Sequence, residues 1–295
     1  MLYLQALVDG ILLGGVYGTV ALGLSLCYGV MGIINWAHGE CLMVAMFLSY
    51  IMVAHFGIDP YLTIFFNAAI FFVIGYLMQK TLFSNLLKKE SNSREPTSIL
   101  LSTAGLGMIL WNVATMIFGS NTHVAHTRYM GKTVWLFNDA MMLSIPRVIS
   151  FLLAIVVTFG MYFFLEKTER GRSIRATSQN REVAALMGIN VGRTFCLAFA
   201  ISLALVGVAG SLLVPIFSIY PKVGAVYAIK AFVIIVLGGQ GNIRGTLAGG
   251  IIVGVVERLT AVLLNESYAL VAVFALFILV LLVKPDGLVS RKSKV

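Results

Sequence analysis

Nine apolar runs, several of them as long as a lipid bilayer is thick, constrain this 295-residue chain more than any other feature. A helix needs about 20 mainly apolar residues to cross the hydrocarbon core of a membrane. Charged residues make up 11% of the chain, against about 25% in soluble domains. We therefore expect an all-α fold, a polytopic transmembrane helical bundle of eight or nine spans that forms one domain over residues 1–295. The runs cover roughly residues 3–30, 40–56, 61–83, 98–118, 146–166, 194–216, 225–238, 245–264 and 268–284.

Basic residues gather between the apolar runs, and their distribution predicts the topology. Segments 80–97, 167–193 and the part after Val283 carry four, six and four Lys or Arg residues, together 14 of the 21 in the chain. Because Lys and Arg accumulate in cytoplasmic loops, we place these segments, including the tail 285–295, in the cytoplasm. The N-terminus is then outside, with nine crossings, or eight if one short helix is re-entrant. The net charge of +9 thus reflects topology, and we expect no nucleic-acid partner.

The sequence indicates neither a metal site nor a nucleotide site. The three cysteines lie inside apolar runs, and no Cys/His pair has the spacing of zinc ligands. The glycine-rich stretch GGQGNIRG at 238–245 lacks both the G-x-G-x-x-G spacing and a preceding strand. HTRYMGKT at 126–133 resembles the end of a phosphate-binding loop but lacks its first glycine. We therefore expect no cofactor on this chain.

The stretch GIINWAHGEC at residues 32–41 places polar side chains between the first two apolar runs. A glycine-rich break inside the bilayer frees backbone groups, so it must face protein or a water-filled cavity. Asn35 can satisfy such groups, and Glu40 near the start of a helix suits the helix dipole. Two interpretations stay open. The break is either a capped turn near the cytoplasmic face, or Asn35, His38 and Glu40 contact a transported solute directly.

A weak internal repeat relates the two ends of the chain. Residues 1–83 read as a helix, a glycine-rich break, a helix, a short turn, a third helix and a basic end, and residues 225–284 read in the same order. Residues 84–224 supply central spans between these two helical repeats. Broken helices in repeated units mark substrate regions in transporters. The second break therefore adds Gly239, Gly241 and Asn242 to the candidates for the substrate path.

Glycines recur every fourth residue in two of the apolar runs. The series are Gly10, Gly14 and Gly18, then Gly245 and Gly249, then Gly250 and Gly254. Small residues at this spacing let helix backbones approach closely. We interpret the series as packing surfaces, with close passage of a solute as the alternative.

The connection at residues 165–195 is too long for a tight turn between two spans. Asn180 can cap a short helix over 181–187 that Gly188 ends. We interpret the segment 167–193 as a coupling loop whose helix inserts into a groove of a partner; an ordinary basic loop at the lipid headgroups is the alternative. The expected apolar face consists of Ile174, Val183, Leu186 and Met187, with Arg175, Arg181 and Glu182 outside.

Three stretches of the chain resemble the permease subunit of bacterial ABC importers for branched-chain amino acids. GIINWAHGE is similar to the family's G-x-I-N-x-A-H-G-E motif, although Trp36 stands where Phe or Met is expected. TERGRSIRATSQNREVAALMGIN is similar to the family's cytoplasmic loop, and KAFVIIVLGGQGNIRGTLAGG to a third family stretch. The resemblance runs from about residue 5 to the terminal KPDGL, and permeases for urea and short-chain amides share it. The E-x-A-A-x-x-G core of the loop appears here as Glu182, Ala184, Ala185 and Gly188.

This resemblance implies a transport subunit rather than an enzyme, a multi-pass protein of the bacterial inner membrane in contact with lipid. It implies a path formed with a second, homologous permease. Two cytoplasmic ATPases would bind ATP–Mg and dock on the 167–193 loop, and a periplasmic binding protein would deliver the amino acid. The residues that the resemblance and the loop pattern assign to ATPase coupling are Arg175, Arg181, Glu182, Ala184, Ala185 and Gly188.

Three other functions are alternatives. An ion-coupled secondary transporter would usually carry a buried carboxylate or charge pair, and apart from Glu40 the second to sixth spans hold almost none. A channel for a neutral solute such as urea would transport without ATPases. A membrane scaffold has no need of polar groups in broken helices. For a zwitterionic substrate, Asn67 and Asn112 are further candidate polar groups besides those of the two breaks.

Overall fold

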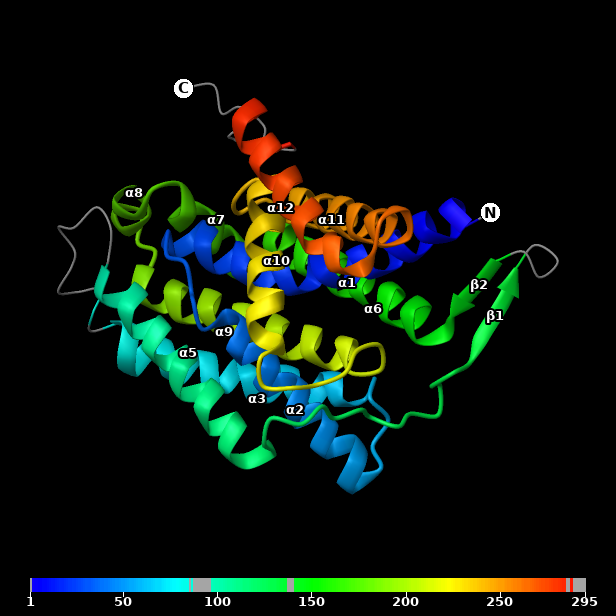
Figure 1. Ribbon diagram of the computed structural model, residues 1–295. Helices are drawn as coiled ribbons and strands as arrows, with labels where there is room; N and C mark the ends of the chain where they lie inside the picture. The colour runs from blue at the N-terminus through cyan, green and yellow to red at the C-terminus, as the bar shows by residue number, and fades with distance from the viewer. Residues whose placement is uncertain (1, 85, 87–96, 137–140, 285–286, 289–295) are drawn as a thin grey trace.

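A computed structural model describes residues 2–84, 86, 97–136, 141–284 and 287–288. It shows a bundle of helices with one small β-hairpin (Figure 1), which confirms the predicted all-α helical bundle. The elements are α1 (Leu2–Met31), α2 (His38–Phe56), α3 (Thr63–Met78) with its π-helical extension η1 (Gln79–Phe83), α5 (Thr97–Phe118), β1 (Thr133–Leu136), β2 (Met141–Ser144), α6 (Ile145–Lys167), α7 (Glu169–Gln179), α8 (Arg181–Leu186), α9 (Val191–Leu213), α10 (Val223–Gly238), α11 (Ile243–Leu263) and α12 (Glu266–Val283).

The predicted apolar runs all become helices. Eight of the described helices are long and apolar enough to cross a membrane, and this number lies within the predicted range. The remaining run forms α10, which has only 16 residues. Most of the basic stretch in 80–97, and the tail 285–295 apart from Gly287 and Leu288, lie outside the described residues.

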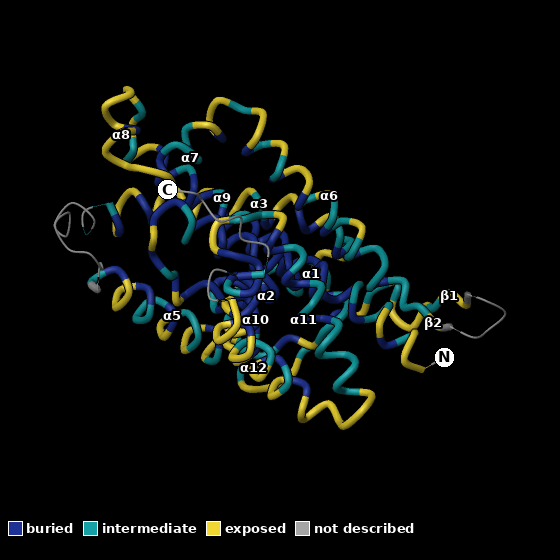
Figure 2. Tube along the Cα trace, turned by 90° about the horizontal axis from the view of Figure 1, so that it is seen from above, coloured by how far each residue is buried: buried dark blue, intermediate teal, exposed yellow. Residues whose placement is uncertain are grey.

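Helix α1 forms the centre of the bundle. Every residue from Leu12 to Cys27 is buried, and Figure 2 shows the buried part of the trace gathered in the middle of the molecule. A Cβ added to Gly14 would lie 2.6 Å from the Gly250 carbonyl oxygen, and one added to Gly254 would lie 2.4 Å from that of Gly10. The series Gly10, Gly14, Gly18 and the series Gly250, Gly254 therefore form a packing surface between α1 and α11, whereas Gly245 and Gly249 pack against α10. Both results confirm the predicted packing role.

Two shorter helices begin after irregular segments. Residues 32–37 precede α2, and residues 214–222 precede α10. Helix α1 packs most extensively against α11, and α3 packs most extensively against α9. In the same way, α2 contacts α9, and α10 contacts α1. The series α1, α2, α3 therefore has a structural counterpart in α9, α10, α11. In Figure 1, α1 and α9 run in opposite directions, as in an inverted repeat.

This packing favours a different internal repeat from the one suggested by the sequence. The sequence pattern aligned residues 1–83 with 225–284 on their glycine-rich breaks. The contacts instead relate the helices of 2–83 to those of 191–263. The reason is that the second glycine-rich stretch is a tight turn between α10 and α11, whereas the counterpart of the first break, at 214–222, contains no glycine. The predicted boundaries of the repeats stay a prediction.

The hairpin and the coupling segment lie at opposite ends of the bundle (Figures 1 and 2). Strands β1 and β2 are antiparallel, with Val134 opposite Leu143 and Trp135 opposite Met142. The predicted cytoplasmic position of segment 167–193 would place the hairpin on the outer side; this sidedness stays a prediction. The sequence did not predict the hairpin, because a strand of four residues is too short to show a clear alternation of apolar and polar residues.

Candidate functional site

The first break doubles back along α1. Gly32 lies in the left-handed region at φ +65°, and its N–H donates to the Tyr28 carbonyl at 2.7 Å. His38, the first residue of α2, has Nε2 2.9 Å from the Val20 carbonyl oxygen. From the end of α1 at Met31 back to Val20 is about 16 Å at 1.5 Å per residue. Helix α2 therefore starts deep inside the bundle and not at the level where α1 ends.

Asn35 caps the break and also keeps an unused donor. Its Oδ1 accepts a hydrogen bond from the Ala37 N–H at 3.0 Å, which confirms its predicted role in satisfying freed backbone groups. The residue is 3% exposed, and its Nδ2 has no hydrogen-bond partner among the described residues. Leaving a buried polar atom unpaired costs about 1–3 kcal/mol. This atom is therefore suited to a ligand that supplies an acceptor.

His38 offers the opposite chemistry beside it. Because the Val20 carbonyl can only accept, Nε2 of the imidazole carries the proton and donates to it. In the neutral ring Nδ1 is then an acceptor. The residue is 1% exposed, and within the described part of the chain Nδ1 has no partner. Asn35 and His38 thus leave one donor and one acceptor unpaired within the same short segment.

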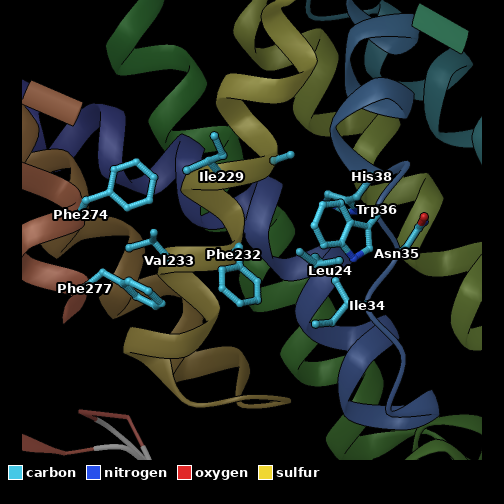
Figure 3. Close-up of a pocket in the computed structure, with 11 residues that line it drawn as sticks. Leu24, Ile34, Asn35, Trp36, His38, Ile229, Phe232, Val233, Phe274 and Phe277 are labelled. Carbon is cyan, nitrogen blue, oxygen red and sulfur yellow. The ribbon is translucent and has the colours of Figure 1, made fainter. Parts of the chain in front are cut away.

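A cavity of about 300 Å³ opens beside these two side chains (Figure 3). It lies between the first break, α10 and α12, and Figure 3 shows Trp36 on one side and the two phenylalanines of α12 on the other. Apart from Asn35 and His38, its walls are apolar or aromatic. Such a cavity with a few polar groups is the usual form of a small-molecule site. It is lined by Leu24, Ile34, Asn35, Trp36, His38, Ala228, Ile229, Phe232, Val233, Phe274 and Phe277.

The N-termini of α2 and α10 meet next to this cavity. A Cβ added to Gly39 would lie 2.2 Å from the Gly224 carbonyl oxygen, and one added to Gly224 would lie 2.5 Å from that of Gly39. Neither helix has a side-chain cap, so the positive ends of two helix dipoles lie together. Glu40, in the first turn of α2 as predicted, has Oε2 2.8 Å from the Cβ position of Gly224. Its carboxylate therefore compensates both helix ends and does not line the cavity.

The second break is a tight turn that packs on the end of α1. Gly239 and Gly241 adopt φ values of +87° and +75°, which favour glycine. Asn242 caps α11, with Oδ1 accepting from the Gly245 N–H at 3.1 Å. A Cβ added to Gly29 would lie 2.7 Å from the Gly241 Cα. These predicted residues lie outside the cavity lining, so their contact with a solute stays a prediction.

Gln240, which the sequence analysis did not single out, comes closer to the candidate path. It lines a smaller hollow that shares Leu24, Ile34 and Phe232 with the main cavity. The hollow therefore connects the second break to the first.

The short helix predicted over 181–187 is confirmed as α8. Asn180 caps it, because its Oδ1 accepts from the N–H groups of Glu182 and Val183 at 3.0 and 3.1 Å. Gly188, at φ +82°, follows the helix in the left-handed region. Both are local signals, so the sequence alone predicts where the helix begins and ends.

The predicted apolar face of the coupling segment is only partly correct. Ile174 is 1% exposed and belongs to the bundle core. Ala184 is also buried, at 3%, while Glu182, Ala185 and Gly188 are exposed. The exposed apolar side chains of α8 and the residue after it are Val183, Leu186 and Met187, at 53%, 86% and 78%. These three form the apolar face that a partner can reach.

The two arginines predicted to take part in ATPase coupling, Arg175 and Arg181, bind within the chain. Nη1 of Arg175 lies 2.6 Å from Oε2 of Glu166 at the end of α6. The Arg181 guanidinium donates to the Met31 carbonyl and lies over the Phe195 ring at 5.2 Å. Partial burial lowers the pKa of Arg181, but an arginine stays charged at neutral pH. Arg181 is exposed and Arg175 is half-exposed, in keeping with the predicted outer position, but each also binds an acceptor in its own chain.

A buried charge cluster escaped the sequence analysis. Nζ of Lys230 in α10 lies 2.8 Å from Oε2 of Glu257 in α11, and the Tyr17 hydroxyl in α1 donates to Oε1 of the same carboxylate at 3.1 Å. The sequence prediction on buried charges concerned the second to sixth spans, and this pair joins two later helices. A search for single opposite charges in different spans could have found it. The charges satisfy one another and line neither cavity.

The other polar candidates lie away from the cavity. Asn67 is fully buried and donates to the hydroxyls of Ser49 and Ser211 at 2.7 and 2.9 Å. It therefore ties α3 to α2 and α9. Asn112 is exposed on α5 and donates to the Met108 carbonyl of its own helix at 2.8 Å. The described residues contain no group of three or more His, Cys, Asp or Glu side chains that could hold a metal ion.

Comparisons with known proteins agree over nearly the whole chain. The family model described as "Branched-chain amino acid transport system / permease component" matches residues 6–281. The chain is 32% identical over 302 residues to the high-affinity branched-chain amino acid transport system permease protein BraD of Pseudomonas aeruginosa, covering 98% of this chain and 96% of that protein. It is 31% identical over 296 residues to the corresponding LivH of Escherichia coli, with the same coverage.

A more distant relative covers less of the chain. The ribose import permease protein RbsC of Haemophilus influenzae is 32% identical over 138 residues, 44% of this chain and 43% of that protein. No solved structure matches the chain.

Proposed function

Because the chain belongs to the family of branched-chain amino acid transport system permease components, we propose that it is the transmembrane permease subunit of an ABC importer for branched-chain amino acids. It is a multi-pass membrane protein and a transport subunit, not an enzyme. A second permease completes the path, two cytoplasmic ATPases bind ATP–Mg and drive transport, and a periplasmic binding protein delivers the solute. The proposed location is the bacterial inner membrane, and the chain itself holds no cofactor.

The observation that carries the proposal is the cavity beside the first break. Leucine, isoleucine and valine combine a carboxylate, an ammonium group and an apolar side chain. The unpaired Nδ2 of Asn35 suits the carboxylate, and the unpaired Nδ1 of His38 suits the ammonium group. The aromatic wall around Phe232 and Trp36 suits the side chain. The broken helices are placed as in transporters, where such breaks form the substrate region.

The apolar face of Val183, Leu186 and Met187 supports ATPase coupling. These side chains are exposed on a short helix that connects two spans. At that end of the bundle, exposed apolar surface on a basic segment is suited to a protein groove. We assign the ATPase as the occupant because the relatives are permease components of transport systems.

Reconstitution tests the proposed function and its alternatives together. Proteoliposomes holding both permeases and the ATPases are expected to take up labelled leucine only with ATP inside and binding protein outside, and to continue with an ionophore present. Uptake that stops with the ionophore and needs no ATP would indicate ion coupling. Transport by this chain without ATPases would indicate a channel. Faster uptake of urea or acetamide than of leucine would assign the other solutes of the family.

Replacing Asn35 with leucine is expected to reduce leucine uptake about tenfold while the complex assembles normally, because a hydrogen bond to a charged group contributes about 1.5–3 kcal/mol. The matched control is Asn112→Leu, which removes an exposed amide on α5 that donates to the Met108 carbonyl of its own helix. Uptake rate per purified complex is the measurement. If Asn35→Leu transports as well as Asn112→Leu, the asparagine is only a cap.

Replacing both Leu186 and Met187 with glutamate is expected to release the ATPases while the permease stays folded, because the change puts two charges on the exposed apolar face. Ala184 is unsuitable for this test, since it is buried and its substitution would disturb the fold. Copurification of ATPases with the tagged permease is the measurement, and Leu186→Met, which keeps the apolar surface, is the control. An intact double-variant complex would contradict docking on α8.

A further inference from the structure

Arg181 joins the coupling segment to the first break. It is the first residue of α8, immediately before the exposed face of Val183, Leu186 and Met187. Its guanidinium donates to the carbonyl of Met31, the last residue of α1. A Cβ added to Gly32 would lie 3.3 Å from Nη2 of Arg181. A cation at this place also suits the negative end of the α1 dipole.

The other contacts of Arg181 fix its position. The guanidinium lies over the ring of Phe195 at 5.2 Å, and Phe195 is buried in α9. Arg181 therefore contacts α1 and α9 from the base of α8. Since the planar guanidinium presents several donors in a fixed arrangement, a shift of α8 acts directly on the last carbonyl of α1.

The break that starts at this carbonyl forms one wall of the cavity. Ile34, Asn35 and Trp36 line the cavity and follow Met31 within five residues. The far end of the break is held to other helices, because the Trp36 N–H donates to Thr103 of α5 and His38 bonds to Val20 of α1. Arg181 holds the near end of the break, at the Met31 carbonyl. Displacement of α8 can therefore move the near end of this wall while the far end stays fixed.

We infer that Arg181 is a positioning residue that transmits movement of the ATPase-docked helix α8 to the first break, and that it does not itself bind the ATPase. This inference rests on the proposed function. It assigns two separate roles to the loop. The exposed apolar face binds the ATPase, and Arg181 moves the cavity wall.

The test compares Arg181→Ala, Arg181→Lys and Arg172→Ala in the full complex with both permeases and ATPases. Arg172 is the matched control, because it is a highly exposed arginine of α7 that pairs with the still more exposed Glu169 at 4.0 Å. Three quantities are measured: ATPases that copurify with the permease, ATP hydrolysis stimulated by loaded binding protein, and leucine transported per ATP hydrolysed.

The expected result is selective uncoupling. Arg181→Ala should keep its ATPases and hydrolyse ATP, while leucine transported per ATP falls about fivefold to tenfold, the loss of one charge-assisted hydrogen bond. Arg181→Lys should recover part of the ratio because it restores the charge, and Arg172→Ala should match the wild type.

Other outcomes would overturn the inference. Release of the ATPases by Arg181→Ala would make the arginine part of the docking contact or of the fold of α8. An unchanged ratio of leucine to ATP would show that movement reaches the break by another route. Failure of the wild-type complex to couple ATP to uptake would instead contradict the proposed function, so the two failures are distinguishable.

Discussion

Replacing Gly39 with valine is expected to remove most of the folded permease from the membrane. The N-termini of α2 and α10 touch at this residue, and even a Cβ would lie 2.2 Å from the Gly224 carbonyl oxygen. Overpacking of side chains costs about 1–3 kcal/mol. Here the obstacle is backbone on a second helix, which cannot change rotamer, so we expect a loss of at least about 3 kcal/mol. Gly224→Val should behave alike, since the contact is reciprocal.

The measurement is the amount and thermal stability of the monodisperse protein in detergent. The matched control is Gly105→Val on α5, where an added Cβ has no heavy atom within 4 Å. Both variants make the same substitution in an apolar helix, so they differ only in the contact. If Gly39→Val and Gly105→Val are equally stable, the two helix ends do not pack as closely as the structure shows, and the cavity beside them loses its support.

Local signals in the sequence carried the predictions that the structure confirms. Asn180 and Gly188 fix the ends of α8 because a cap and a left-handed residue act within a few residues. The glycines of α1 predict close helix packing for a similar reason, since only a missing side chain allows it. Asn35 was correctly predicted to satisfy the backbone of the break, and Glu40 to lie at a helix start.

Relations between distant residues could not be read from the sequence. The counterpart of the first break, at 214–222, has no glycine and so does not match the first break in its sequence pattern. The contacts in the structure show that α1 packs against α11. A comparison of the two helix sequences cannot show this. Arg181 and Met31 are 150 residues apart, and an arginine in a basic loop normally faces water. The sequence therefore predicts its neighbours along α8 but not the carbonyl that it binds.

The walls of the cavity were also beyond sequence analysis, for a reason specific to membranes. Phe232, Phe274 and Phe277 belong to strongly apolar runs. An aromatic side chain that lines a cavity therefore has the same composition signal as one that faces lipid. Only polar residues stand out against that background, which is why Asn35 and His38 could be singled out and their apolar neighbours could not.

A buried charge also stands out against apolar spans, and the second large effect on stability is expected at such a charge. Replacing Lys230 with methionine is expected to destabilise the permease by about 3–5 kcal/mol, because the Glu257 carboxylate loses its cation in a buried place. Nζ of Lys230 lies 2.8 Å from that carboxylate and 4.4 Å from the centre of the Tyr17 ring. The lysine thereby ties α10 to α11 and α1. A permease with a stability of about 5–15 kcal/mol would lose a large part of it.

A double-mutant cycle separates the pair from its surroundings. Lys230→Met with Glu257→Gln removes both charges, so the double variant should regain most of the stability that either single variant loses. The measurement is the midpoint of thermal or denaturant unfolding in detergent for all four proteins. Arg172→Met, which removes one charge of a highly exposed pair, should change stability by less than about 1 kcal/mol. If the double variant is as unstable as the sum of the singles, the two charges do not interact, and α10 must be held beside α1 by apolar packing alone.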